Sequence, residues 1–342
     1  MEKEKVDELK ALLSQPKKAV IIPHRNPDGD AIGSTLALQQ YLQQCGHDAV
    51  VVAPNDFPDF LKWIPGVEEM ILFSTETEKA KQLIADAELI FTLDFNHFSR
   101  TGNDMEAVLN QTDSTYVMID HHQAPADYAA YTYSDTSISS TCQMIYHFLE
   151  MMDATDKITK DIATCLYVGI MTDTGSFRFA STTSTTHRVI ADLIDKGAKN
   201  SDIHQQVYDT NSTNRMQLLG VALNNMKVLP ELKTAYITLS QEELDTNNFK
   251  KGDTEGFVNY SLSIKGIVFA AIFIENKQDQ IIKISLRSKG NFDVNQFARD
   301  HFNGGGHINA AGGKSDLSLN ETITSFESTI KNYKNELEDA QE

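Results

Sequence analysis

Acidic residues and histidines gather directly after the apolar, strand-like stretches in the first half of this 342-residue sequence. Three stretches show the pattern: "AVII" at 19–22, "LIFTL" at 89–93 and "YVMI" at 116–119. The residues that follow them are His24, Asp28 and Asp30, then Asp94, then Asp120, His121 and His122. A further acid, Asp173, closes the helical pattern "CLYVGIMTDT" and precedes a glycine. Because the carboxyl ends of parallel strands face one edge of a sheet, we expect these side chains to share a rim.

Each of these residues has a simpler explanation when it is taken singly. An aspartate after a strand is commonly the N-cap of the next helix, and a single histidine is commonly a surface or satisfied core residue. N-capping, however, accounts neither for His24 nor for the His121–His122 pair. Converging carboxylates would also repel one another without a cation. The pattern therefore favours a metal site.

The donor set contains oxygen and imidazole ligands and no thiolate. Carboxylate favours Mg²⁺ or Mn²⁺, and imidazole shifts the preference toward Mn²⁺, Fe²⁺ or Zn²⁺, so Mn²⁺ is the compromise. The candidate ligands are too many for one ion that keeps water positions, and they suit two ions that share a carboxylate: His24, Asp28, Asp30, Asp94, His121 and Asp173. Two ions about 3.5–4 Å apart can activate a water and stabilise a phosphoryl transition state. The residues therefore predict phosphoester hydrolysis.

A second candidate site lies where the chain loses its acidity. Residues 251–314 contain eight Lys or Arg and six Asp or Glu, whereas the whole chain has a net charge of −18. This stretch contains Arg287 and Ser288 in "SLRS", and Gly304, Gly305, Gly306 and His307 in "NGGGHINAAGG". Consecutive glycines let backbone N–H groups approach a phosphate, and a guanidinium binds phosphate with a fork of donors. A flexible loop is the alternative for the glycines, and the local charge favours a phosphate site.

Strand-like and helix-like patterns alternate in the first half, which predicts an α/β fold with a mainly parallel sheet. We expect a Rossmann-like catalytic, metal-binding domain over 1–185, a helical connector over 186–230, and a smaller α/β substrate-binding domain with a mixed sheet over 231–342. The active site is expected in a cleft between the domains. We expect the helix after the first strand to open at Gly33 and Ser34, with its positive end near the metal loop.

Composition limits the compartment and the partners. No run of 18 or more apolar residues occurs, and the charged N-terminus lacks a secretory signal pattern, so we expect no membrane segment and no export. The scattered Cys45, Cys142 and Cys165 form no CxxC pair, which favours a reducing cytoplasm. The net charge argues against binding long nucleic acid but not against a small anionic substrate. A homodimer is left open.

These motifs resemble those of the DHH phosphoesterase family. "HRNPDGDAIGS" is similar to the family's first motif, Asp94 to its second, "DHH" at 120–122 to its naming motif, and Asp173 in "MTDTGSF" to its fourth. "GGGHINAAGG" is similar to the glycine-histidine motif of the DHH-associated C-terminal domain. The motifs occur in the family's order and span most of the chain.

The resemblance implies a role for each motif residue. His24, Asp28 and Asp94 would bind one Mn²⁺, and Asp30, Asp94, His121 and Asp173 would bind the other, with Asp94 bridging. Mg²⁺ and Co²⁺ are alternative metals. Asp120 would orient a histidine, and His122 would stabilise the scissile phosphate or protonate the leaving oxygen. The substrate's other phosphate would be held across the cleft by Arg287, Ser288 and a turn of Gly305, Gly306 and His307.

Within the family, the short two-domain form resembles the NrnA-like branch of nanoRNases and 3′-phosphoadenosine 5′-phosphate (pAp) phosphatases. This branch implies hydrolysis of very short RNA to mononucleotides and dephosphorylation of pAp. The alternative is a phosphodiesterase for cyclic di-AMP or for linear dinucleotides such as pApA, and a pyrophosphatase or a non-catalytic nucleotide sensor is less favoured. Arg100 is open between a substrate contact and a surface arginine, and His97 is expected near the rim without binding metal. No residue marks itself as an aromatic that stacks on a base.

Overall fold

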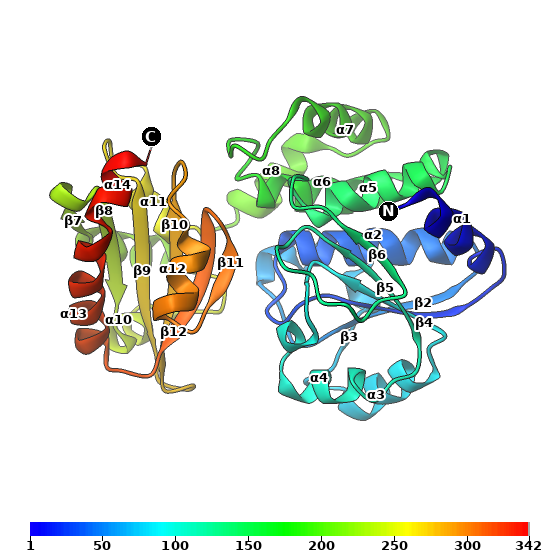
Figure 1. Cartoon of the computed structure of the whole chain (residues 1–342), viewed down its shortest axis with the longest axis horizontal. Helices are drawn as coiled ribbons and strands as arrows, with labels where there is room; N and C mark the ends of the chain where they lie inside the picture. The colour runs from blue at the N-terminus through cyan, green and yellow to red at the C-terminus, as the bar shows by residue number, and fades with distance from the viewer. Residues whose placement is uncertain (341–342) are drawn as a thin grey trace. The chain divides into compact units, whose positions relative to one another are not determined.

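The computed structural model describes residues 1–340, and the chain divides into two compact units at Thr210 and Asn211 (Figure 1). Each unit has its own six-stranded sheet. The stretch expected as a helical connector, 186–230, is mostly helical, with its last helix in unit 2. The predicted domain borders stay predictions. None of the described helices combines the length and apolar character needed to cross a lipid bilayer.

The sheet of unit 1 is entirely parallel and has the strand order β3-β2-β1-β4-β5-β6. Its strands are β1 (Lys18–Ile22), β2 (Asp48–Ala53), β3 (Ile71–Leu72), β4 (Leu89–Leu93), β5 (Thr115–Asp120) and β6 (Tyr131–Ser134). This is the order of a doubly wound Rossmann fold, as the alternating pattern predicted. The short edge strands β3 and β6 carry too few residues to show a strand pattern, and the sequence did not predict them.

Helices cover both faces of this sheet (Figure 1). The α-helices of unit 1 are α1 (Lys3–Leu12), α2 (Gly29–Gln44), α3 (Thr77–Asp86), α4 (Asn103–Leu109), α5 (Thr141–Met151), α6 (Lys160–Asp173), α7 (Ser184–Asp195) and α8 (Asn200–Tyr208). Helices α2, α5 and α6 lie on one face and α3 and α4 on the other. Successive strand residues enter opposite cores, so Ile21 packs on the α2 side while Val20 and Ile22 pack on the α3 side. Coverage of both faces explains why the strand sequences are continuously apolar.

Unit 2 contains the predicted mixed sheet, with the order β11-β12-β10-β9-β8-β7. Its strands are β7 (Lys227–Leu229), β8 (Thr234–Leu239), β9 (Phe269–Asn276), β10 (Ile281–Ser288), β11 (Gly305–His307) and β12 (Ala310–Ser315). Strands β8 and β9 are parallel and the other pairs are antiparallel. The α/β class predicted for this part of the chain is confirmed.

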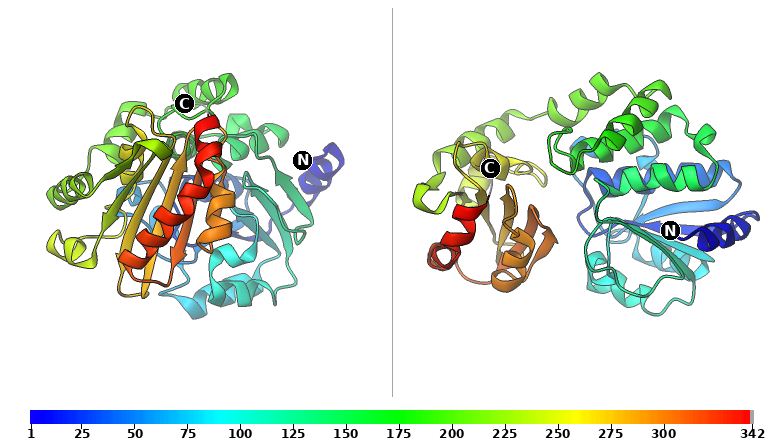
Figure 2. Two further views of the ribbon diagram at one scale, coloured as in Figure 1. Left: turned by 60° about the vertical axis from the view of Figure 1, so that its left-hand side comes forward. Right: turned by 45° about the horizontal axis from the view of Figure 1, so that its top comes forward.

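The helices of unit 2 also pack on both faces of its sheet. They are α9 (Thr213–Asn224), α10 (Gln241–Thr246), α11 (Phe257–Leu262), α12 (Val294–His301), α13 (Leu319–Thr329) and α14 (Lys334–Asp339). Figure 2 shows the C-terminal helices α13 and α14, in red, along one face. Strand β9 alternates, with Phe269 and Phe273 in the core beneath α12 and α13, and Ile272 in the core beneath α9 and α11.

The carboxyl ends of β1, β4 and β5 lie level with one another at one edge of the sheet of unit 1. Ile22 of β1 pairs with Thr92 of β4, and Leu93 of β4 pairs with Ile119 of β5. The strand order reverses between β1 and β4, which is the position where open α/β sheets form their ligand sites. The residues that follow β1, β4 and β5 therefore emerge side by side at this switch point.

The start of α2 differs from the sequence prediction. The helix begins at Gly29, not at Gly33, because Asp28 is its N-cap and accepts hydrogen bonds from the N–H groups of Asp30 (3.0 Å) and Ala31 (3.1 Å). The prediction that Gly33 and Ser34 open the helix is wrong. Gly33 lies inside the helix. A glycine is needed there because a Cβ would come within 2.4 Å of the Cys165 carbonyl oxygen of α6.

Candidate metal centre

The first loop of the centre joins β1 to α2 and contains His24 and Asp28. Asp28 has two tasks, since its Oδ1 caps α2 while its Oδ2 lies 3.9 Å from Nε2 of His24. The capping explanation therefore holds for Asp28, and it leaves Oδ2 beside His24, so that the role of Asp28 as a metal ligand stays a prediction. Asn26, between them, adopts a left-handed conformation (φ 55°), and its N–H donates to Oδ1 of Asn55 at 2.7 Å. The Asn55 side chain also donates to Asn26 Oδ1 at 2.9 Å, so the tip of the loop is held at two points.

Asp94 lies at the middle of the centre, directly after β4. It is 2% exposed and adopts a left-handed conformation (φ 65°). Strain of this kind persists where the surrounding structure holds it, and it recurs at functional sites. The two carboxylate oxygens face different histidines, Oδ2 lying 3.4 Å from Nε2 of His24 and Oδ1 lying 3.4 Å from Nε2 of His121. One carboxylate thus connects two groups of donors.

Among the described residues, three groups of donor atoms share Asp94, and two of these consist of predicted metal ligands. His24, Asp28 and Asp94 offer ligand atoms that all lie within 4.8 Å of one another, and so do Asp30, Asp94 and His121. These are oxygen and imidazole donors of the kind that Mn²⁺ accepts, so the residues fit a pair of divalent ions. The structure brings these predicted ligands together, and their binding of metal stays a prediction.

Asp173 lies beside the second group, next to His121. It is the last residue of α6, and its Oδ2 lies 3.4 Å from Nε2 of His121. Nε2 of His121 also lies 3.8 Å from Oδ2 of Asp30. The helix end thus delivers Asp173 to the rim that β1, β4 and β5 form.

Asp30 is supported by the N-terminus of α5. Its Oδ2 accepts the N–H of Thr141 at 2.6 Å and its Oδ1 accepts the N–H of Cys142 at 2.8 Å. These are the first two helical residues of α5, so a carboxylate occupies the positive end of the helix dipole. The hydroxyl of Thr141 donates to Oδ1 of Asp94 at 2.9 Å. Thr141 therefore contacts Asp30 and also Asp94, the carboxylate that the donor groups share. The sequence interpretation missed Thr141 because "SSTC" looks like an ordinary helix start.

Close packing of α2, α5 and α6 positions Asp30. A Cβ on Gly169 of α6 would lie 2.1 Å from Sγ of Cys142 and 2.8 Å from Oδ1 of Asp30. Gly29, at the start of α2, leaves similarly little room, because its Cβ would lie 2.5 Å from Oγ1 of Thr172. These two glycines provide the close approach that the donor groups need.

Mutual interactions shift the pKa values of the clustered groups in opposite directions. Burial by itself would lower the pKa of His121, but its hydrogen bond to Asp94 and the charges of Asp173, Asp94 and Asp30 raise it well above its ordinary value. Burial would raise the pKa of Asp94, yet hydrogen bonds from His121 and His24 hold it well below its usual range. Burial and the charges of Asp94 and Asp173 raise the pKa of Asp30 well above normal. Bound protons thus balance the negative charge, and a divalent cation would replace them.

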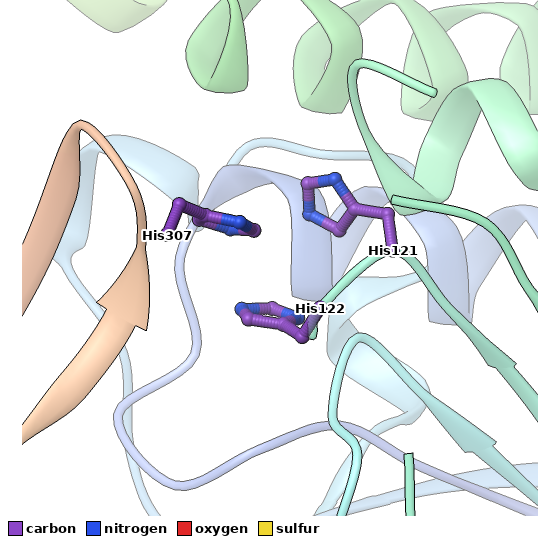
Figure 3. A group of neighbouring side chains, drawn as sticks. All are labelled: His121, His122 and His307. Carbon is purple, nitrogen blue, oxygen red and sulfur yellow. The ribbon is translucent and has the colours of Figure 1, made fainter. Parts of the chain in front are cut away.

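His122 lies within hydrogen-bond distance of Asp120, and the orienting role of Asp120 stays a prediction. Nδ1 of His122 lies 2.7 Å from Oδ1 of Asp120, which is fully buried, and 3.7 Å from Oδ1 of Asp94. The rings of His121 and His122 meet edge to face at 5.0 Å, and both project from the end of β5 (Figure 3). The ring of His122 thus lies beside the donor groups.

Two loops beside the centre are linked through backbone hydrogen bonds. The N–H of Arg25 donates to the carbonyl of Arg100 at 2.7 Å, which joins the first loop to the 3-10 turn η3 (Phe98–Thr101). Arg100 lies half-buried in this turn, and its contact with substrate stays a prediction. His97 is the N-cap of η3 and accepts the N–H of Ser99 through Nδ1 at 3.1 Å. It belongs to none of the donor groups found among the described residues.

The glycine-rich stretch of unit 2 is a strand pair connected by a turn at Ile308 and Asn309, and not an irregular loop. Gly305–His307 form β11 and pair with β12. A Cβ on Gly304 would come within 2.0 Å of the Gly312 carbonyl oxygen, and one on Gly306 within 2.4 Å of the Ala310 carbonyl oxygen. Two of the glycines are therefore needed for strand packing, whereas Gly305 has ordinary space. His307, also drawn in Figure 3, ends β11.

Arg287 and Ser288 end the neighbouring strand β10. An Nη of Arg287 donates to the carbonyl of Leu286 at 2.9 Å. The hydroxyl of Ser288 is buried, donates to the carbonyl of Phe292 at 2.6 Å and accepts from the Asn309 side chain at 2.9 Å. Ser288 thus shapes the loop after β10, and phosphate binding by this group of residues stays a prediction.

Comparison with known proteins decides the family. The DHH family N-terminal domain matches residues 18–170, and the DHHA1 domain matches residues 233–336. A bifunctional oligoribonuclease and PAP phosphatase NrnA from Thermus thermophilus is 31% identical over 309 residues, which cover 88% of this chain and 86% of that protein. The chain belongs to the DHH family of phosphoesterases.

Other similar proteins differ in how much of their own length matches this chain. The NrnA of Bacillus subtilis is 29% identical over 85% of this chain and 88% of its own length. The cyclic-di-AMP phosphodiesterase GdpP of the same organism is 26% identical over 95% of this chain but only 49% of its own length. The crystal structure of an exopolyphosphatase-related protein from Bacteroides fragilis matches with a TM-score of 0.94 at 39% identity, covering 99% of this chain and 98% of that one. The predicted family and fold class are thereby confirmed.

Proposed function

We propose that this chain is a Mn²⁺-dependent hydrolase that degrades very short RNA to mononucleotides and removes a phosphate from pAp. The observation that carries the proposal is the pair of donor groups that share Asp94. One ion in each group would supply an activated water and neutralise the charge of the phosphoryl group. The printed activities of the NrnA relatives from T. thermophilus and B. subtilis support this choice of substrates.

The protein's own residues divide the work. His24 and Asp28 would complete one metal site, and Asp30, His121 and Asp173 the other. When His122 is protonated and its Nδ1–H is donated to Asp120, the remaining acidic proton lies on Nε2, from where it can pass to the leaving oxygen.

We further propose that unit 2 binds the substrate's second phosphate. The residues would be Arg287, Ser288, Gly305, Gly306 and His307. The net positive charge of residues 251–314 supports an anionic ligand here. Separately, we propose Arg100 of unit 1 as a substrate contact. The three unpaired cysteines support the reducing cytoplasm as the compartment.

A phosphodiesterase for cyclic di-AMP or pApA is the second candidate. The relatives named cyclic-di-AMP phosphodiesterases support it, although this chain spans about half of their length. The substrate preference of the purified protein separates the two candidates. We expect a labelled RNA trimer and pAp to be turned over faster than cyclic di-AMP in Mn²⁺, and the reverse order would favour the second.

A pair of variants tests the site itself. Asp94→Asn should remove hydrolysis of every substrate, because one carboxylate serves both donor groups. The matched control is Asp113→Asn, which changes an exposed acid in the loop before β5. Retained activity in Asp94→Asn, with Asp113→Asn also active, would refute the proposed centre.

A further inference from the structure

The chain takes an uncommon path directly after Asp173. Gly175, Ser176 and Phe177 are consecutive left-handed residues, with φ of 57°, 60° and 66°. Residues with a Cβ rarely adopt this conformation, and two of these three carry one. The turn therefore depends on the structure around it.

Local hydrogen bonds and an aromatic anchor hold this turn. The N–H of Ser176 donates to the carbonyl of Met171 at 2.8 Å, and the Ser176 hydroxyl lies 3.1 Å from Nε2 of His204 on α8. The half-buried ring of Phe177 packs against Tyr167 of α6, with ring centroids 5.8 Å apart. Phe177 thus faces inward and fixes the turn to the helices of unit 1.

Phe179, two residues later, packs its ring on the backbone of the same turn. The tip of this ring covers Gly175 so closely that a Cβ there would lie 2.4 Å from Cζ. Yet Phe179 remains 40% exposed. The ring is therefore supported from one side and open to solvent on another, and a glycine is required beneath it.

The tip of the supported ring packs on Gly175, which follows the predicted ligand Asp173 by two residues. Gly175 follows Asp173 by two residues, so their Cα atoms are at most about 7.6 Å apart. Oδ2 of Asp173 lies 3.4 Å from Nε2 of His121. The other large exposed apolar side chains described in unit 1, Ile194 and Tyr208, have no such donor as a chain neighbour.

We propose that Phe179 is a stacking platform for a nucleobase of the substrate. An aromatic ring accepts the face of any base, which suits an enzyme for short RNA of mixed sequence. Arg178 supports this role, because its Nε donates to the carbonyl of Gly175 at 2.7 Å and keeps an exposed cation beside the ring. The proposal rests on the proposed function and adds to it a site that recognises the base as distinct from the phosphate.

Equilibrium binding separates base recognition from phosphate recognition. We would measure the Kd values of adenosine 5′-monophosphate and ribose 5-phosphate by calorimetry in Mn²⁺, for the full-length protein and its variants. Phe179→Ala should weaken binding of the nucleotide about 5- to 150-fold, the range that corresponds to ~1–3 kcal/mol for one stacked base. Binding of ribose 5-phosphate should stay within twofold. Phe179→Trp should keep the affinity for the nucleotide, and Phe179→Leu should lose most of it.

The controls keep this result interpretable. Ile194→Ala removes another apolar side chain that is 40% exposed and should change neither Kd. Equal weakening of both ligands by Phe179→Ala, or no weakening of either, would overturn the stacking role. Failure of the proposed function looks different, because the unaltered protein would then hydrolyse neither short RNA nor pAp.

Discussion

Replacing Thr141 by valine removes one hydroxyl from beneath the metal centre and leaves the backbone unchanged. The lost contact is the 2.9 Å hydrogen bond to Oδ1 of Asp94, whereas the 2.6 Å bond from the Thr141 N–H to Asp30 persists. Thr141 is fully buried, so water cannot replace the donor. A hydrogen bond to a charged group contributes about 1.5–3 kcal/mol.

The expected effect on metal binding is at the lower end of that range. Oδ1 of Asp94 also lies 3.4 Å from His121 and 3.7 Å from His122, and these donors offset part of the loss. We expect Thr141→Val to weaken Mn²⁺ binding about 10-fold, which corresponds to about 1.4 kcal/mol and is the low end of the usual cost of losing a partner of a metal ligand. The free energy of unfolding of the metal-free protein should fall by about 1–2 kcal/mol.

Thr141→Ser is the matched control, because it keeps the hydroxyl and loses only a buried methyl group. Calorimetric titration of the metal-free proteins with Mn²⁺ gives the affinities, and urea unfolding in EDTA gives the stabilities. Thr141→Ser should bind Mn²⁺ within a few-fold of the unaltered protein. If Thr141→Val and Thr141→Ser bind Mn²⁺ equally well, the hydroxyl does not position Asp94.

Three further predictions test the surroundings of the centre. Gly169→Ala should weaken Mn²⁺ binding and lower the melting temperature, because its Cβ would lie 2.1 Å from Sγ of Cys142; unchanged titration and melting curves would show that α6 can shift. Asn55→Ala should weaken Mn²⁺ binding a few-fold by releasing the two hydrogen bonds to Asn26, and metal titration that matches the unaltered protein would contradict this. The raised pKa of His121 stabilises the metal-free protein fully below its unfolded value of about 6.5, and this stabilisation is lost as pH rises through the folded value. The melting temperature in EDTA should therefore fall as the pH rises above about 6.5, and it should fall less with saturating Mn²⁺. Parallel curves of melting temperature against pH, with and without Mn²⁺, would count against a metal that replaces the proton.

Much of the centre could be predicted from local sequence because parallel strands impose a common direction. Continuous apolar stretches identified β1, β4 and β5, and a polar residue directly after such a strand must emerge at the shared edge. This is why His24, Asp94 and His121 could be grouped although they lie far apart in the chain. Asp28 could not be assigned in this way. Its position before a helix fits a helix cap and a metal ligand equally well, and in the structure it caps α2 and also lies in a donor group.

Residues that act through close packing were beyond the sequence. Thr141 looks like the start of any helix, and only the approach of α5 to α2 turns its hydroxyl and N–H toward two carboxylates. The beginning of α2 was misplaced because Gly33 signals a break in a sequence, whereas in the fold it admits the backbone of α6. The role proposed for Phe179 likewise depends on three left-handed residues that no periodicity reveals.

The sequence by itself determined the class of sheet and the donor atoms at the ends of its main strands, because hydrophobic period and chain direction are local properties. Only the tertiary structure decided how these donors divide, with Asp94 between two groups. It also decided which residues support them. Distances between side chains on different elements depend on how the helices and the sheet pack together. These distances are not encoded in any local stretch of sequence, because close packing couples residues that lie far apart in the chain.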